Sequence, residues 1–114
     1  MIKFNNVTLD AEMVLGDTGT FSITPKLDGE TYLSDGDSVT FTVRKRKDTT
    51  QLIMQKSITS FEDGTCTIPI VPSDTSGKDA GTYIYDIVVT RGDGTVDTLT
   101  PNGQAYFTLK KGVR

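Results

Sequence analysis

The chain has 114 residues, of which 35% are hydrophobic and 24% charged, with a formal net charge of −3 at pH 7. This composition excludes a disordered chain, and the length allows one domain, 1–114, with a single core and no large enzyme framework. The charge argues against nucleic-acid binding, because the one basic run, Arg44-Lys45-Arg46-Lys47, is short and contains no aromatic residue. We interpret that run as a solvated strand end and turn.

Targeting features are missing from the sequence as given. No apolar segment follows Lys3, so the opening residues do not predict a signal peptide. No stretch approaches the roughly 20 apolar residues of a membrane helix, and we expect no membrane insertion. The single cysteine, Cys66, excludes an internal disulfide bond and favours folding in a reducing cytoplasm. Export by another route, or release by lysis as part of a particle, remains compatible with this pattern.

Apolar residues recur with a period of two, which predicts β-strands and not helices. Val39, Phe41 and Val43, for example, point to one side of their strand, and the 19 threonines of the chain also favour strands. In chain order, the predicted strands cover 2–9, 20–24, 38–46, 51–58, 65–71, 82–91, 95–100 and 104–110.

Turn residues separate these strands. Asp-Gly pairs occupy 28–29, 35–36, 63–64 and 93–94, and Asn102-Gly103 adds one more. Such pairs tolerate the positive φ angles of tight hairpins, and their frequency is typical of a sandwich or a small barrel. The stretch 72–79 predicts a loop with a short helical turn. We therefore expect one all-β unit.

The segment 79–87, Asp-Ala-Gly-Thr-Tyr-Ile-Tyr-Asp-Ile, carries the most informative motif. Its pattern Asp79-x-Gly81-x-Tyr83-x-Tyr85 resembles the Asp-x-(Ala/Gly)-x-Tyr-x-Cys motif of immunoglobulin-like domains. The resemblance implies a tyrosine corner, in which the Tyr83 hydroxyl bonds backwards to the main chain. It also places Phe41 where the family has its buried tryptophan, and Tyr85 where it has a cysteine. We expect an immunoglobulin-like two-layer antiparallel β-sandwich in which aromatic volume replaces the disulfide bond.

A narrower resemblance covers residues from about 14 to 109. It is carried by Gly16-Asp17-Thr18 before a strand, by 37–43, by Pro72-Ser73-Asp74-Thr75, by 81–87, and by 94–99 before Gly103. In this order the segments look like the immunoglobulin-like N-terminal domain of phage baseplate upper proteins and related prophage virion proteins. Longer members of that family continue into receptor-binding segments. Because this sequence ends at Arg114, the resemblance implies an anchoring module alone, or a stand-alone relative with a different place in the particle.

Residues suited to catalysis are scarce. Histidine is absent, which removes the usual general base and the commonest metal ligand. Cys66 shares a strand face with Ile68 and Ile70 and is expected to be a buried, inert thiol. The carboxylates lie mostly in turns, and no two are marked as facing a cleft. We expect no enzyme, no catalytic residue and no cofactor.

Two short motifs have simpler explanations than binding. Ser34-Asp35-Gly36-Asp37-Ser38 has a carboxylate spacing used in calcium loops, but further ligands and a closing glutamate are missing. Turn geometry explains it better, so we expect no metal site. Arg91-Gly92-Asp93 spells an integrin-binding tripeptide, but a three-residue match is weak evidence, and a glycine-rich hairpin turn explains it better.

Ile84 and Val88 lie on the opposite face of strand 82–91 from the predicted core residues. They form either part of a contact patch or a surface covered by a loop or by the N-terminal segment with Met13, Val14 and Leu15. The pattern favours coverage, and the patch is the functional hypothesis.

The resulting expectation is a phage or prophage virion structural module, in the tail or baseplate, that acts by protein–protein contact. Its partners would be itself, as a homo-oligomer, or another virion protein, and not nucleic acid. Docking would use the face of strand 82–91, or the N-terminal segment added to an open sheet edge. The protein would reside in the bacterial cytoplasm during assembly and then in the virion. The alternative is a carbohydrate- or receptor-binding module that uses loops around 28–37 and 91–94, and a small enzyme is a weaker third hypothesis.

Overall fold

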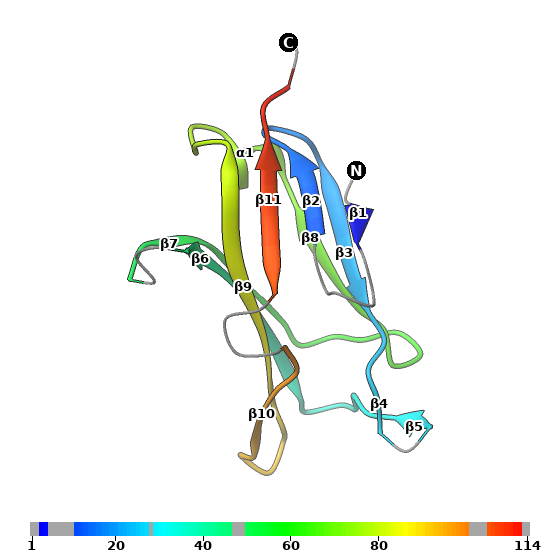
Figure 1. Cartoon of the computed structure of the whole chain (residues 1–114). Helices are drawn as coiled ribbons and strands as arrows, with labels where there is room; N and C mark the ends of the chain where they lie inside the picture. The colour runs from blue at the N-terminus through cyan, green and yellow to red at the C-terminus, as the bar shows by residue number, and fades with distance from the viewer. Residues whose placement is uncertain (1–2, 5–10, 28, 47–49, 101–104, 113–114) are drawn as a thin grey trace.

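Strands packed in two layers make up most of the chain (Figure 1). The structure is a computed structural model that describes residues 3–4, 11–27, 29–46, 50–100 and 105–112. In chain order the elements are β1 (Lys3–Phe4), β2 (Ala11–Val14), β3 (Gly19–Ile23), β4 (Lys26–Leu27), β5 (Glu30–Thr31), β6 (Ser38–Lys45), β7 (Leu52–Ile58), β8 (Cys66–Ile70), α1 (Pro72–Thr75), β9 (Gly81–Thr90), β10 (Val96–Thr98) and β11 (Tyr106–Lys110). The predicted all-β, immunoglobulin-like sandwich is confirmed.

The larger layer is a seven-stranded sheet in the order β1-β2-β11-β9-β6-β7, with β10 also paired to β9. The smaller layer is the antiparallel pair β3–β8, and β4–β5 form a separate short hairpin. Every described pair is antiparallel except β2–β11, which is parallel. These two strands lie far apart in sequence, so no hairpin turn forces them to run in opposite directions.

Most of the predicted strands are present, with ends shifted by one or a few residues. The exceptions are near the N-terminus and in the segment 24–37 between β3 and β6. Of the predicted strand 2–9, β1 covers Lys3–Phe4 and pairs with β2, while 5–10 lie outside the described residues. Strand β2 and the short strands β4 and β5 were not predicted, because four and two residues are too few for a clear alternation.

The predicted helical turn in 72–79 is confirmed as α1. Pro72 stands at its start, where a missing N–H is harmless. The Asp74 carboxylate accepts a 2.8 Å hydrogen bond from the main-chain N–H of Val71, which satisfies one of the free donors of this turn. Thr75 is fully buried, and its hydroxyl accepts a 2.8 Å bond from the N–H of Gly16. The helical turn is thereby fixed to the loop that precedes β3.

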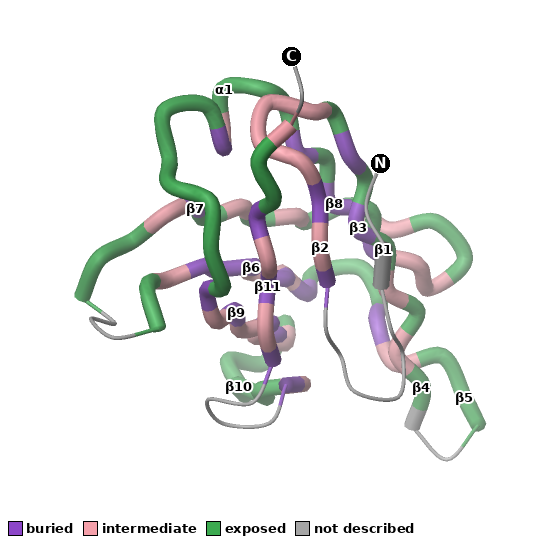
Figure 2. The backbone as a smooth tube through the Cα atoms, turned by 45° about the horizontal axis from the view of Figure 1, so that its top comes forward, coloured by how far each residue is buried: buried purple, intermediate pink, exposed green. Residues whose placement is uncertain are grey.

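Strand β9 pairs with three other strands of the larger sheet. It is paired with β6 from Ser38–Thr90 to Lys45–Tyr83, with β11 at its beginning and with β10 at its end. Along β9, buried and more exposed residues alternate strictly after Thr82, which is the period of a strand with one face on the core (Figure 2).

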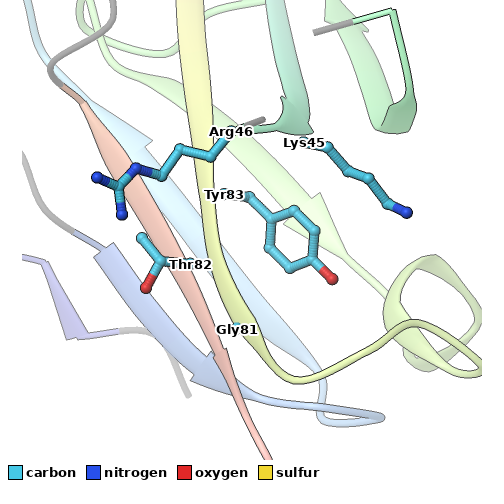
Figure 3. Close-up of a pocket in the computed structure, with 5 residues that line it drawn as sticks. All are labelled: Lys45, Arg46, Gly81, Thr82 and Tyr83. Atoms are coloured by element: carbon cyan, nitrogen blue, oxygen red, sulfur yellow. The ribbon is translucent and has the colours of Figure 1, made fainter. Parts of the chain in front are cut away.

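The predicted tyrosine corner is present at the start of β9, and Figure 3 shows its Tyr83 side chain. The Tyr83 hydroxyl donates a 2.5 Å hydrogen bond to the main-chain oxygen of Asp79. Burial, and then the nearby charge of Asp79, raise the pKa of the Tyr83 phenol. The neutral phenol is thus kept as a donor, and the corner ties the incoming loop to the sheet.

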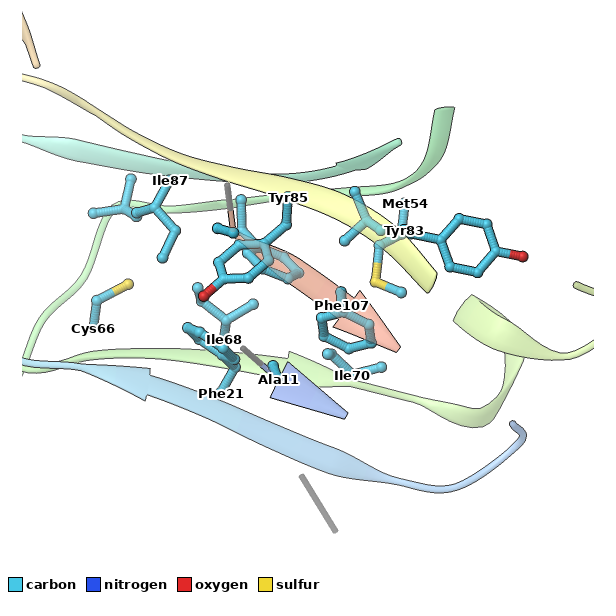
Figure 4. Close-up of a cluster of buried hydrophobic side chains, with 14 of the residues drawn as sticks. Ala11, Phe21, Met54, Cys66, Ile68, Ile70, Tyr83, Tyr85, Ile87 and Phe107 are labelled. Atoms are coloured by element: carbon cyan, nitrogen blue, oxygen red, sulfur yellow. The ribbon is translucent and has the colours of Figure 1, made fainter. Parts of the chain in front are cut away.

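The two layers are joined by a cluster of aromatic rings (Figure 4). Phe21 of β3 stacks on Phe41 of β6 at 5.3 Å and meets Tyr85 of β9 edge-on at 5.6 Å, measured between ring centroids. Tyr85 also meets Phe107 of β11 edge-on at 6.3 Å. In immunoglobulin domains a disulfide joins the second strand of one sheet to strand F of the other. Phe21 and Tyr85 join β3 and β9 here without a covalent bond.

Candidate interaction surfaces

The larger sheet has a face that points away from the core, called here the outer face. Because residues paired across strands share a face, the pairings assign its members. They include Leu52, Gln55 and Ser57 of β7, Thr40, Thr42 and Arg44 of β6, Ile84, Asp86 and Val88 of β9, Val96 and Thr98 of β10, and Tyr106 of β11. This face crosses five strands and mixes hydroxyl groups with aliphatic side chains.

The aliphatic members of the outer face are accessible to different degrees. Leu52 and Val96 are 48% and 59% exposed, which is unusual for large apolar side chains. Ile84 and Val88 are half-buried within the sheet, with Ile84 between Arg44 and Tyr106 and Val88 between Thr40 and Thr98. Both predicted patch residues therefore reach the surface.

Of the described N-terminal residues, Met13, Val14 and Leu15 do not cover this patch, contrary to the expectation for these three residues. Met13 is only 3% exposed and contributes to the core, so it is not a surface contact residue. Val14 is half-buried and pairs with Lys110, and half-buried Leu15 packs against the core. The reason is geometric: β2 extends the sheet beside β11 instead of crossing over it, so strand alternation sends Met13 inward.

Polar groups of the outer face are bonded sideways along it. The Gln55 amide donates to the Thr42 hydroxyl at 3.1 Å, and the Thr100 hydroxyl donates to Asp86 at 3.3 Å. The Arg46 guanidinium lies over the Tyr106 ring, 5.1 Å from its centroid. These contacts hold the polar side chains in place, which reduces the entropy that a partner would have to remove on binding.

The two loops of the alternative binding hypothesis, 28–37 and 91–94, meet at one end of the sandwich. Asp37, which is 4% exposed, joins them. Its carboxylate accepts main-chain hydrogen bonds of 3.0 Å each from Ser34 and Gly92, and lies 3.4 Å from Nε of Arg91. Burial alone would raise the pKa of Asp37. The two main-chain donors and Arg91 lower this pKa by a larger amount, so the net shift is downward. The ionised carboxylate is the link between the loops.

Arg91 turns toward its own protein. Its guanidinium lies 4.3 Å from the centroid of the Tyr32 ring, and the Tyr32 hydroxyl donates to Asp97. This bond, with burial, raises the pKa of Tyr32. Because the arginine of the Arg91-Gly92-Asp93 tripeptide is held between Tyr32 and Asp37, the motif has a structural role. Asp37 likewise uses its carboxylate oxygens to join the loops, which gives this member of the Asp35–Asp37 pair a structural role.

An open cleft of about 700 Å³ lies at the other end of β6 and β9 (Figure 3). Its lining residues are Lys45, Arg46, Gly81, Thr82 and Tyr83. Among these described lining residues, two side chains are cationic, two carry hydroxyl groups and none is acidic. Sequence reasoning did not find this cleft, because Lys45 and Arg46 become neighbours of Gly81 and Tyr83 only through the β6–β9 pairing.

Chemically reactive groups are not gathered in the described part of the chain. Cys66 is fully buried, and burial raises the pKa of its thiol to about 11. Within the described ranges, no three acidic or sulfur side chains converge as metal ligands. No helix among these residues is long and apolar enough to cross a membrane.

Comparisons with known proteins add no relative to these observations. A scan against protein-family models finds no family that matches the chain, and a search of curated proteins finds no match.

Proposed function

We propose that this protein is a structural module of a phage or prophage virion, in the tail or baseplate, and that it acts by protein–protein contact. The proposal rests on the sequence resemblance over residues 14 to 109 and on the fold that the resemblance implies. The protein is made in the bacterial cytoplasm and enters the particle during assembly.

The outer face is the observation that carries the proposal. Leu52, Ile84, Val88 and Val96 place aliphatic side chains on a sheet face whose other side is occupied by the core. Binding a partner there buries apolar surface, at roughly 25 cal/mol per Å², while the polar groups between them are already ordered. The face thus suits a lasting contact with another protein of the particle.

Mass spectrometry of particles purified from the induced source strain tests this proposal. We expect peptides of this chain in the purified particles, in constant proportion to the other tail proteins across gradient fractions. Absence of the chain from particles that contain all other tail proteins would contradict the proposal.

The convergence of loops 28–37 and 91–94 favours one second candidate, a carbohydrate- or receptor-binding module. Tyr32 is half-buried beside Arg91 at this end, and aromatic rings with neighbouring polar groups suit a sugar. A glycan array probed with the wild type and with Tyr32→Ala tests it. Binding that depends on Tyr32 would support this function. An array that shows no glycan binding would contradict it and leave the virion module as the proposed function.

A further inference from the structure

One end of the molecule is rich in acidic residues, whereas the opposite end carries both signs, with Asp74 and Asp79 near Lys45 and Arg46. The acidic end is formed by the segment 24–37 between β3 and β6, the β7–β8 loop and the β9–β10 hairpin. Its acidic residues are Glu30, Asp35, Asp37, Glu62, Asp63, Asp93 and Asp97, and its described basic residues are Lys26 and Arg91. Strands β4, β5 and β10 mark this end at the bottom of Figure 1. The cleft with Lys45 and Arg46 lies beyond the opposite end of β6.

The acidic end has a defined tip. Gly36 and Gly92 lie so close that a Cβ atom on Gly92 would stand 3.5 Å from the Gly36 oxygen. Asp35 and Asp93, the neighbours of these glycines, are both exposed. Asp93 accepts a 2.9 Å hydrogen bond from the N–H of Thr95, and the Thr95 side chain, followed by this N–H, lowers the pKa of Asp93. The tip therefore presents two carboxylates on loops that Asp37 already joins.

The cleft has matching groups in defined places. The Arg46 guanidinium is positioned by the Tyr106 ring. Thr82 and Tyr83 add hydroxyl groups, and Gly81 leaves open space, since a Cβ there would meet nothing within 4 Å. Lys45 and Arg46 point to opposite sides of β9 (Figure 3), and the described lining residues include no carboxylate, so each cation offers a partner for one carboxylate of the tip.

We propose that the tip of one copy, with Asp35 and Asp93, docks into the cleft of a second copy, with Lys45 and Arg46. A copy cannot fill its own cleft, because the strand β6 holds the two sites about 25 Å apart at roughly 3.3 Å per residue. Repeated from copy to copy, this contact is head-to-tail, and it builds a ring if the rotation closes or a filament if it does not. The inference goes beyond the virion assignment, because it uses the ends of the molecule and not the outer face.

Sedimentation equilibrium of the wild-type protein at low salt tests the contact. A protein with a net charge of −3 and evenly spread charges would repel its copies, whereas tip-to-cleft docking predicts a weight-average mass that rises with concentration. The association constant is expected to fall at least about tenfold between about 0.02 M and 0.5 M salt, since the pairs are near the surface. A constant monomer mass up to about 1 mM protein at low salt would overturn the proposal.

Charge reversal separates this contact from a general charge effect. The cleft variant Lys45→Glu/Arg46→Glu and the tip variant Asp35→Lys/Asp93→Lys are each expected to be monomeric, and an equimolar mixture of the two is expected to associate again. The control Lys78→Glu/Lys111→Glu makes the same change in net charge outside the cleft and is expected to retain association. Unfolding midpoints near that of the wild type identify folded variants. Equal loss in the control, or no recovery in the mixture, would refute tip-to-cleft docking.

Discussion

The Tyr83 hydroxyl donates a 2.5 Å hydrogen bond to the main-chain oxygen of Asp79, four residues earlier. The ring of Tyr83 is 6% exposed, whereas Asp79 is exposed. One bond therefore anchors a surface loop to the first core residue of β9. This is the relationship that the motif Asp79-x-Gly81-x-Tyr83 implied.

Replacing Tyr83 by Phe keeps the ring and removes the bond. We expect the free energy of unfolding to fall by about 1 kcal/mol, because the exposed Asp79 carbonyl can bond to water instead. Urea denaturation followed by circular dichroism measures the change. An unchanged midpoint would mean that the hydroxyl does not stabilise the corner.

The aromatic cluster predicts that a substitution of Phe41 lowers the free energy of unfolding more than Tyr83→Phe does. Its ring is fully buried and contacts Phe21, Tyr85 and Phe107. Phe41→Ala is expected to lower the free energy of unfolding by about 3–5 kcal/mol, through lost transfer energy and a residual cavity. The same substitution at half-buried Phe61 is the control and should have a clearly smaller effect in the same urea titration. Similar losses at the two positions would contradict an inter-layer role for this cluster.

The lowered pKa of Asp37 predicts that the stability of the protein decreases at acid pH. Its pKa is lower in the folded protein, despite the opposing effect of burial, because Ser34, Gly92 and Arg91 favour the charged form. A depressed folded-state pKa adds stability above the unfolded value of about 3.9, and this stability is lost as the pH falls through the folded-state pKa.

The substitution Asp37→Asn should therefore destabilise the protein at neutral pH. Hydrogen bonds to charged groups suggest about 1.5–3 kcal/mol. The difference from the wild type should shrink below about pH 4. Thermal unfolding at a series of pH values, with Asp35→Asn as the exposed control, measures it. A difference that stays constant down to strongly acidic pH would exclude the charge of Asp37 as the link between the loops.

The burial of Cys66 predicts that its thiol reacts slowly with thiol reagents in the native state. Its side chain is fully buried and its pKa is raised to about 11, so both access and the thiolate fraction are low at pH 8. An aromatic disulfide reagent is expected to react with Cys66 only as fast as the protein unfolds, and at once in denaturant. Rapid reaction of the folded protein would contradict this burial.

The core strands could be predicted from sequence because their alternation is long. Strand β9 alternates over most of its ten residues, so both its core face and Tyr83 were identifiable. Four residues of β2 carry too little periodicity, and Met13 was therefore assigned to the surface although it faces the core. The direction of a short segment is decided by which neighbour it pairs with, and that is a tertiary property.

The interaction surfaces were predictable only in part. Ile84 and Val88 follow from alternation within one strand, whereas Leu52 and Val96 join them through pairings of β7 with β6 and of β10 with β9. The role of Asp37 was hidden for the same reason, because its partner Gly92 lies 55 residues away in the chain. Sequence patterns report local geometry, and these contacts depend on register between distant strands.

The outer face as a contact surface within a virion is the central claim, and quantitative mass spectrometry of complemented particles tests it most directly. Particles would be produced in cells that supply the wild type, Ile84→Glu/Val88→Glu, or the control Thr20→Glu/Thr67→Glu on the exposed side of the smaller sheet. We expect equal copies per particle of the wild type and the control, and loss of the outer-face variant although it remains folded in the lysate. Equal incorporation of all three proteins, or absence of the wild type from the particles, would contradict the account.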